Sequence, residues 1–262
     1  MSKATDFLAL HVKGTPLLMP NPWDVGSARV LEALGYRALA TTSSGAAAVV
    51  GRLDGGLSRD ESLAGAAAIA AAVAVPVSAD LENCFADSAD GVAGTVALAR
   101  AAGLAGCSVE DWDPVRKEIY PLEVAVERVR AAVGAADGLV ITARAEGMLR
   151  GGELPAVVER LQAFEAAGAP VVFAPGVRTA DQIKTVVDAV AVPVNVLARG
   201  GMPSIAELAA LGVARISVGG SFAWAAYAGL IEAATELRDQ GTYDYWSNVE
   251  AAMPTVRGAM QS

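Results

Sequence analysis

The sequence predicts one α/β domain over residues 1–262, a (β/α)8 barrel of the TIM type with an extra helical segment at its C-terminal end. Three observations lead to this fold class. Eight short apolar runs are each followed by a segment of helical periodicity, which is the pattern of parallel strands covered by helices. No linker or change of composition separates the eight repeats. A length of 262 residues is typical of one such barrel.

The expected strands are runs of about five to eight mostly apolar residues. They lie at 15–20, 38–43, 77–83, 105–111, 138–146, 169–176, 193–198 and 214–220. An open doubly wound sheet is the alternative, but it usually carries a Gly-rich nucleotide turn after its first strand. Here Asn21-Pro22-Trp23-Asp24 stands at that point, so the barrel is favoured.

The expected helices alternate with these strands, after a short helix at the N-terminus. They lie at 26–34, 58–73, 91–102, from 121 onward, 154–167, 179–187, from 204 onward and 221–237. Ser58 and Ser204 are suitable N-caps, and Pro121 suits a first helical turn. The C-terminal tail, 238–262, carries Tyr243, Tyr245 and Trp246 beyond the eighth repeat. This tail is either an intrachain cap or a segment that packs on a neighbouring subunit of a homo-oligomer.

Composition excludes several classes of partner. A formal charge of −9, with a single histidine and no basic stripe, argues against nucleic acid and against an anionic membrane surface. No apolar run approaches the roughly 20 residues of a membrane span. The first residues lack the layout of a signal peptide, and two cysteines are too few for a disulfide framework. We therefore expect a cytoplasmic protein.

Asp80 and Glu82 end the third expected strand and, being two residues apart, share one face of it. Adjacent carboxylates repel each other, and a hard cation would offset the repulsion, since only oxygen ligands are offered. A pair of solvated loop acids is the alternative.

Active sites of such barrels lie at the carboxyl ends of the strands. The polar residues expected there are Ser43, Ser44, Gly45, Asp54, Asp80, Glu82, Glu110, Asp111, Arg144, Glu146, Asn195 and Arg199. Acids from three consecutive strands beside one arginine suit a divalent cation together with a substrate carboxylate. The alternatives are acids that only cap helices, and a structural salt bridge from Arg144 to Glu146 or Glu110.

Six segments in this order carry a resemblance to a known family. They are 21–29 (NPWDVGSAR), 41–46 (TTSSGA), 53–56 (LDGG), 78–83 (SADLEN), 109–111 (VED) and 142–146 (TARAE). The ordered set resembles the isocitrate lyase/phosphoenolpyruvate mutase superfamily. The resemblance implies an α/β barrel that binds Mg²⁺, or Mn²⁺ in its place, and cleaves or forms C–C or C–P bonds beside a 2-oxo or 2-hydroxy acid. It also implies a homo-oligomer, a dimer or a tetramer that exchanges C-terminal helices.

The resemblance also implies roles for single residues. Asp80 matches the acid that contacts the metal, while Asp54, Glu82 and Glu110 match acids that hold its water ligands. Ser44, Gly45 and Ala46 match the loop that takes the substrate carboxylate, and Arg144 the arginine that clamps the oxo acid. The expected catalytic set is Arg144, Glu110 and Asp54, and Asn195 and Trp23 join the substrate-binding set. The family usually has Asp where Glu82 stands, a difference of one methylene.

The loop after the fourth strand, 113–120, departs from the family pattern. It reads DPVRKEIY and lacks the Lys-Lys/Arg-Cys-Gly-His motif of the lyases. Arg116 and Lys117 either enter the site or are solvated. Cys107 is expected to be a small buried residue, and Cys84 is expected to serve packing.

The leading hypothesis is a Mg²⁺-dependent lyase that cleaves a C–C bond next to the 2-oxo or 2-hydroxy group of a small carboxylic acid, through an enolate-like intermediate. Within the same superfamily, an oxaloacetate hydrolase or decarboxylase and a phosphonopyruvate-type C–P enzyme remain open. Outside it, segments 198–201 (ARGG) and 218–221 (VGGS) resemble phosphate-binding loops of barrel enzymes. A protein that binds a 2-oxo acid with little activity is the remaining alternative.

Overall fold

The computed structural model describes residues 3–261 and contains one eight-stranded parallel sheet rolled into a nearly closed barrel. Its strands are β1 (Leu17–Met19), β2 (Leu39–Ala40), β3 (Val77–Asp80), β4 (Gly106–Glu110), β7 (Val140–Arg144), β8 (Val171–Phe173), β9 (Val194–Leu197) and β10 (Arg215–Ser217). The strand order is β1-β10-β9-β8-β7-β4-β3-β2. Each expected strand is present, so the predicted fold class is confirmed.

The barrel closes between its first two strands by few contacts. Among residues 3–261 no ladder joins β1 to β2. Instead the N–H of Ala40 donates to the carbonyl of Pro20 at 3.1 Å. The side chain of Asn21 adds to the closure, because its Nδ2 donates to the carbonyl of Thr41 at 2.9 Å.

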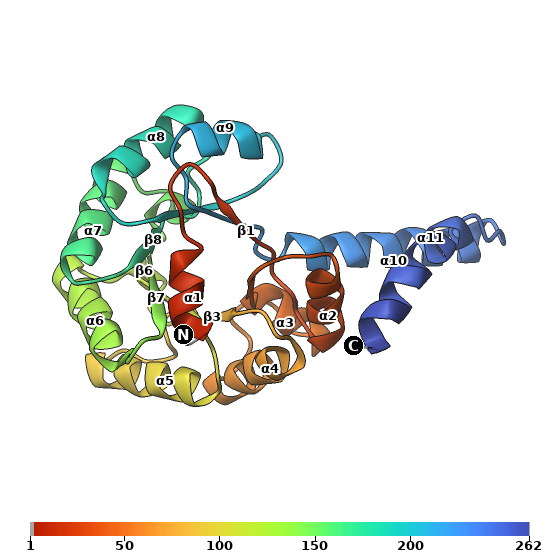
Figure 1. Cartoon of the computed structure of the whole chain (residues 1–262), viewed down its shortest axis with the longest axis horizontal. Coiled ribbons are helices and arrows are strands. Elements are labelled where there is room, and N and C mark those ends of the chain that lie inside the picture. The colour runs from red at the N-terminus through yellow and green to blue at the C-terminus, as the bar shows by residue number, and fades with distance from the viewer. Residues whose placement is uncertain (1–2, 262) are drawn as a thin grey trace.

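Helices surround the strands as a ring (Figure 1). They are α2 (Val25–Ala33), α3 (Ser43–Val49), α4 (Arg59–Ala72), α5 (Ala89–Ala101), α6 (Leu122–Ala135), α7 (Leu154–Ala166), α8 (Ala180–Ala189) and α9 (Ile205–Ala210). Several begin with the side-chain caps that the sequence predicts. Ser58 and Ser204, for example, each accept from the N–H of a glutamate three residues on.

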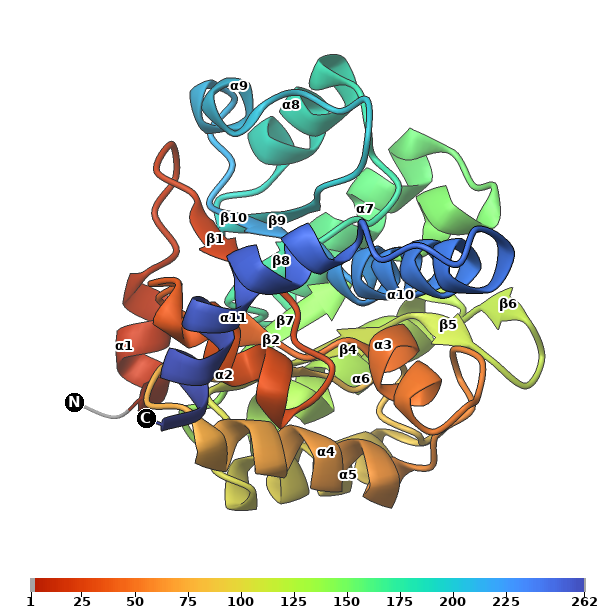
Figure 2. The ribbon, with the colours of Figure 1, turned by 90° about the vertical axis from the view of Figure 1, so that its right-hand side faces the viewer.

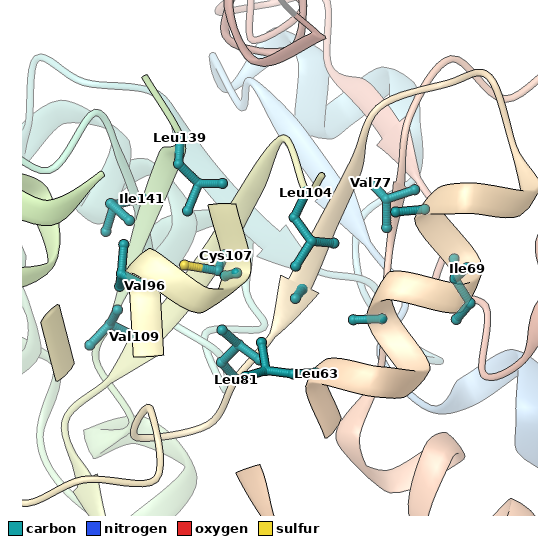
Figure 3. Packing of buried hydrophobic residues seen from close by; sticks show 14 of the residues in the cluster. Leu63, Ile69, Val77, Leu81, Val96, Leu104, Cys107, Val109, Leu139 and Ile141 are labelled. Carbon is teal, nitrogen blue, oxygen red and sulfur yellow. The ribbon is translucent and has the colours of Figure 1, made fainter. Parts of the chain in front are cut away.

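The hydrophobic core lies between the strands and this ring. Figure 3 shows one part of it, where Leu63 and Ile69 of α4 pack with Val77 of β3 and with Leu104 and Cys107 near β4. A second cluster packs α6 to α9 against β7 to β10. Cys84 and Cys107 are both buried and unpaired, as expected.

A helix before the first strand, α1 (Lys3–Ala9), covers the amino-terminal end of the barrel. Phe7 is fully buried there with Ala105, Val140 and Val171 from the starts of the strands or from just before them. Figure 2 shows α1 at one end of the barrel and an antiparallel hairpin, formed by β5 (Trp112–Asp113) and β6 (Glu118–Ile119), at the other. The carboxyl ends of the strands therefore remain open for a site.

Three short elements were not expected from the sequence. They are α3, an antiparallel hairpin of β5 (Trp112–Asp113) and β6 (Glu118–Ile119), and the 3₁₀ helix η1 (Gly147–Arg150). Small residues in α3 resemble a loop, but Thr42 caps it by accepting from the N–H of Gly45. The hairpin occupies the loop that departs from the family pattern.

The C-terminal part forms two helices, α10 (Ser221–Asp239) and α11 (Trp246–Gln261), that extend away from the barrel to one side (Figure 1). Helix α11 returns to pack against α2 (Figure 2). The predicted tail is thus helical and makes an intrachain contact. Within residues 3–261, no helix combines the length and the apolar character needed to cross a membrane.

Candidate active site

A cavity of about 370 Å³ opens at the carboxyl ends of the strands. Five of the predicted site residues line it, namely Ser44, Asp54, Asp80, Arg144 and Asn195. Arg199 lies at its exposed mouth. Trp23 and Ala46 instead line a smaller neighbouring pocket behind α3. The fold thus brings these residues from four separate strands or their following loops (β2, β3, β7 and β9) to one cavity.

Asp80 is held by its neighbours at the end of β3. Its Oδ2 accepts from the N–H of Ser43 at 3.2 Å, and its Oδ1 accepts from Ser108 Oγ at 3.2 Å. Ser108 is the register partner of Asp80 on β4. The N–H of Asp80 in turn donates to Thr41 Oγ1 at 2.9 Å. The carboxylate is therefore fixed in place, with lone pairs left to accept a further ligand.

Arg144 ends β7 and lies among three carboxylates. Its Nη1 is 3.7 Å from Asp80 Oδ1, its Nε is 3.4 Å from Glu110 Oε2, and the same Nε is hydrogen-bonded to Glu146. Burial acts to lower the pKa of Arg144, but the charges of Glu110, Glu146 and Asp80 raise it above its usual value. Arg144 is thus permanently charged, and both pairings weighed for it in the sequence are present.

The carboxylates around Arg144 exceed the positive charge available to them. Burial, together with the charges of Asp80 and Asp54, raises the pKa of Glu82 to about 7. Burial also raises the pKa of Glu110 well above its usual range, against the opposing charge of Arg144. Raised carboxyl pKa values mark a site that would gain from another cation.

The carboxylates of the cavity fit a Mg²⁺ ion that has one direct protein ligand and keeps most of its waters. Among residues 3–261, no three His, Cys, Asp or Glu side chains converge closely enough to ligate one metal ion together. Mg²⁺ is commonly held by one or two carboxylates and keeps several of its waters. Asp80 could supply the direct ligand, and Asp54, Glu82 and Glu110 could bind water. The excess of carboxylates in a partly buried site supports this fit.

The loop at the start of α3 places its serines toward the cavity. Ser43 and Ser44 line it, whereas Gly45 does not. The N–H groups of Gly45 and Ala46 both donate to Thr42, to its Oγ1 and its carbonyl respectively. A Cβ on Gly45 would lie 2.8 Å from Trp23 Cβ, so Trp23 packs behind the loop and requires glycine there.

Glu110 and Asp111 point in opposite directions, as successive strand residues do. Glu110 faces Arg144. Asp111 faces away, accepts from the N–H of Glu146 at 2.7 Å and pairs with Arg160 at 3.2 Å. Asp111 therefore has a structural role.

The segment after Asp80 is a tight loop, 82–87, in which Glu82, Cys84 and Phe85 all have left-handed backbone conformations. Arg128 of α6 holds this loop. Its guanidinium donates to the carbonyls of Asn83, Ala86 and Asp87 and stacks 4.3 Å from the centre of the Tyr120 ring. A buried arginine thus fixes the backbone that carries Glu82.

The β5–β6 hairpin lies beside the cavity. Arg150 of η1 stacks 4.0 Å from the centre of the Trp112 ring and ion-pairs with Glu146 at 3.3 Å. Arg116 and Lys117 are exposed at the turn of the hairpin. Both cysteines lie outside this loop, and burial raises the pKa of Cys84 to about 12. Neither the hairpin nor Cys84 therefore supplies a thiolate to the cavity.

The Gly-rich loop after β10 is already occupied by a side chain. The N–H groups of Val218 and Gly219 both donate to Asn21 Oδ1 at 2.9 Å. These are donors that a bound phosphate would need. This use of the loop weighs against the phosphate-binding alternative.

Sequence reasoning left out several residues of the cavity. Ser108 and Arg215 line it and were not among the polar residues expected there, and Ser43, which was expected there, was given no role. Glu146 was expected at a strand end and was weighed as an ion-pair partner of Arg144; it is fully buried and lines the cavity as well. For Ser108 the signal was available, because it shares a strand face with Glu110.

Comparison with known proteins places the chain in one group. Residues 7–238 match the family model described as phosphoenolpyruvate phosphomutase. An uncharacterized protein of Mycobacterium tuberculosis is 33% identical over 216 residues, which cover 81% of either chain. The 2-methylisocitrate lyase of Escherichia coli is 32% identical over 210 residues, covering 75% of this chain and 71% of the lyase.

Solved structures agree with the sequence relatives. A putative lyase/mutase from Burkholderia cenocepacia is 45% identical with a TM-score of 0.89, covering 93% of this chain and 90% of that one. A 2,3-dimethylmalate lyase is 29% identical with a TM-score of 0.83, with the same coverage of both chains. An oxaloacetate acetylhydrolase, in complex with the product oxalate, is 25% identical with a TM-score of 0.85, covering 98% of both.

Proposed function

The chain belongs to the phosphoenolpyruvate phosphomutase family, and on that premise we propose that it is a Mg²⁺-dependent carbon–carbon lyase. Its substrate would be a small carboxylic acid with a 2-oxo or 2-hydroxy group next to the bond that breaks. The observation that carries this proposal is the position of Arg144 among Asp80, Glu110 and Glu146 at the cavity. Relatives that are a 2-methylisocitrate lyase and a 2,3-dimethylmalate lyase support it.

The geometry explains how the chain's own residues would serve such a reaction. Breaking a C–C bond beside a 2-oxo group leaves an enolate, whose negative charge must be stabilised. Arg144 offers a fixed, partly buried positive charge that needs no reorganisation when the enolate charge develops. Ser43 and Ser44, at the N-terminus of α3, also line the cavity and would orient the substrate carboxylate there.

Asp80 would hold Mg²⁺ directly, with Asp54, Glu82 and Glu110 on its water ligands. When bound, the ion supplies Lewis-acid stabilisation of the oxo and carboxylate oxygens. Glu110 and Glu82 have raised pKa values without such a cation, and their ionised forms would be favoured by it. Asn195 would contribute to the wall that the substrate contacts.

Hydrolysis of oxaloacetate belongs to the same proposal as a second candidate. An oxaloacetate acetylhydrolase is similar over almost the whole chain. The loop 113–120 lacks a cysteine, so a route that needs a cysteine acid is disfavoured. Identifying the products that are released would distinguish lyase cleavage from hydrolysis.

A homo-oligomer completes the proposal. Helix α10 buries only Ala223 among its residues, and it exposes Trp224, Leu230 and Ile231. An apolar surface of this kind is typical of a protein–protein interface. A dimer or tetramer in which another copy covers α10 accounts for it. The buried, unpaired cysteines support a reducing compartment such as the cytoplasm.

The direct test is a panel of small 2-oxo and 2-hydroxy acids, assayed with Mg²⁺ for release of pyruvate, glyoxylate or oxalate. We expect turnover of at least one acid and its loss on adding excess chelator. Asp80→Ala should abolish the metal-dependent turnover, whereas Asp90→Ala, at the exposed start of α5, should preserve it. Turnover that persists in Asp80→Ala or in chelator would contradict the proposal. Binding of an acid with Mg²⁺ but no product from the panel would favour the binding-protein alternative.

A further inference from the structure

A second arginine, Arg215 of β10, lies deep in the same cavity. Its side chain is 3% exposed and lines the cavity. One of its partners is His11, which follows the helix that covers the amino-terminal end of the barrel. Arg215 is therefore at the floor of the cavity, on the side away from its mouth.

The partners of Arg215 are all neutral. Its Nε donates to Asn195 Oδ1 at 2.9 Å, and its Nη1 donates to Thr142 Oγ1 at 3.1 Å. His11 Nδ1 is 2.9 Å from the carbonyl of Phe7, and His11 Nε2 is 3.3 Å from Arg215 Nη1. Burial and the charge of Arg215 lower the pKa of His11 to about 3, so the ring is neutral and Nε2 accepts the hydrogen bond.

No carboxylate balances the charge of Arg215. Among residues 3–261, none lies within 4 Å of its guanidinium, whereas Arg144 has three carboxylates within that distance. Arg215 Nη2 has no hydrogen-bond partner in the described part of the chain. It is also absent from the few side-chain atoms there that are both sealed from solvent and unpaired, which are Arg29 Nε, Arg128 Nε and Glu146 Oε2. Nη2 is therefore open to the cavity.

The surroundings of Arg215 suit a ligand better than they suit a buried charge alone. A desolvated charge without a counter-charge is costly, and burial lowers the pKa of Arg215 to about 9. The nearby walls carry Ser78, Asn195 and Ser217, which are polar and buried. The volume of about 370 Å³ lies within the range of small-molecule sites.

We propose that Arg215 forms a second anion subsite at the floor of the cavity, where it binds the far carboxylate of the substrate. The enzyme would therefore select dicarboxylic over monocarboxylic 2-oxo acids of the same chain length. The inference rests on the proposed function, because it assumes that the near carboxylate and the oxo group bind beside Arg144. Asn195 would help to position the guanidinium, since its Oδ1 accepts from Arg215 Nε and its Nδ2 donates to Ser217 Oγ at 3.0 Å.

The test compares acids that differ only in the far carboxylate. Isothermal titration with Mg²⁺ would give dissociation constants for three pairs: 2-oxosuccinate with 2-oxobutyrate, 2-oxoglutarate with 2-oxopentanoate, and 2-oxoadipate with 2-oxohexanoate. In the wild type we expect at least one diacid to bind about 10- to 100-fold more tightly than its partner, the range of a charge-assisted hydrogen-bonded pair. Equal affinities within all three pairs would overturn the subsite, whatever the variants do.

Variants then locate the preference. Arg215→Met should remove most of the diacid advantage while leaving monoacid affinity within about threefold, and Arg215→Lys should keep part of it. Arg199→Met is the matched comparison, because Arg199 is the exposed arginine at the mouth. Loss of the advantage in Arg199→Met but not in Arg215→Met would overturn the assignment. Melting temperatures show whether each variant is folded. If Arg215→Met does not fold, the comparison of diacid and monoacid affinities in the wild type still tests the subsite.

These titrations, together with the product-release assay of the proposed function, separate the two proposals. If neither diacids nor monoacids bind in the presence of Mg²⁺, the proposed function fails and the subsite with it. If monoacids bind and are turned over as well as diacids, the function stands and only the subsite fails.

Discussion

Arg144 keeps its positive charge because carboxylates surround it, and this charge suits the catalytic role that we propose for it. Glu110, Glu146 and Asp80 keep its charge in a partly buried position where a lone arginine would be costly. Arg144→Lys keeps the charge but loses the planar fork that can contact a carboxylate and an enolate together. We expect it to lower kcat/KM by about 100-fold or more, on the scale of other electrostatic contacts to a transition state.

Steady-state kinetics on whichever acid the panel identifies would check this expectation. Arg59→Lys, at an exposed position on α4, is the control and should leave kcat/KM unchanged. A fall of less than threefold in Arg144→Lys would show that the reaction does not depend on that fork.

Glu82 should make the metal-free protein less stable as pH rises. Its pKa is about 7 in the folded protein against an ordinary 4.5, so the folded state binds the proton more tightly than the unfolded chain does. This contribution is largest below pH 4.5 and is lost between about 4.5 and 7. At about 1.4 kcal/mol per pKa unit, it amounts to about 3–4 kcal/mol.

Urea unfolding in chelator at pH 5 and pH 7.5 would measure the effect. Glu82→Gln should lose less stability between these two pH values than the wild type, because the amide does not titrate. Glu127→Gln, on the exposed side of α6, should behave as the wild type does. If the wild type and Glu82→Gln lose the same stability between pH 5 and pH 7.5, a group other than Glu82 is responsible for the pH dependence.

At the level of single residues, the sequence identifies groups at strand ends better than groups inside strands. Asp80, Arg144 and Asn195 were expected at the cavity and line it. Arg215 was not expected, because a charge in the middle of an apolar run does not by itself indicate which face it occupies. The face that Arg215 occupies depends on the register of β10 in the barrel and on the contact that His11 makes with its guanidinium.

The 82–87 loop depends on a helix that lies outside the active site. Three of its residues have left-handed conformations, which cost energy in residues other than glycine. Arg128 holds this loop through three carbonyls, so Arg128→Met would leave those carbonyls unpaired. We expect the free energy of unfolding to fall by about 2–4 kcal/mol.

Denaturant unfolding would measure that loss, and calorimetry would show whether Mg²⁺ affinity falls with it. Arg130→Met is the matched control, since Arg130 lies two residues away on α6 and is exposed. We expect Arg130→Met to stay within 0.5 kcal/mol of the wild type, roughly the scale of surface substitutions. Equal stability of the two variants would contradict the role of Arg128.

Long elements were predictable and short ones were not. The eight repeats were found because apolar runs and N-caps such as Ser58 recur along the whole chain. Helix α3 and the β5–β6 hairpin were not predicted from the sequence, because single side-chain contacts rather than a periodic pattern stabilise them. Thr42 caps α3, and Asp113 Oδ1 accepts from the N–H groups of Val115 and Arg116 in the hairpin turn.

At the scale of the whole molecule, α10 is the feature that a lone chain does not explain. Leu230 and Ile231 are 62% and 64% exposed, although both are large and apolar. If another copy covers them, the wild type should be a dimer or tetramer in solution. Leu230→Asp combined with Ile231→Asp should shift it toward smaller species, because charges would be buried at the interface.

Light scattering coupled to size-exclusion chromatography would give the masses. Glu232→Ala is the control, because Glu232 is the exposed neighbour of the pair and its removal buries no charge. A wild type that is monomeric at concentrations of tens of micromolar would contradict the oligomer. Equal masses for the wild type and the double variant would place the interface elsewhere.

The closure between β1 and β2 has a consequence for motion. The barrel is held together there by the Ala40–Pro20 hydrogen bond and by Asn21, which reaches both Thr41 and the loop after β10. Local unfolding should begin where the ladder is missing, and amide hydrogens there should exchange early. Met19 and Ala40 flank this closure and also line the cavity. A ligand that fills the cavity would therefore suppress the opening, so that occupancy of the site and rigidity of the barrel are thermodynamically linked.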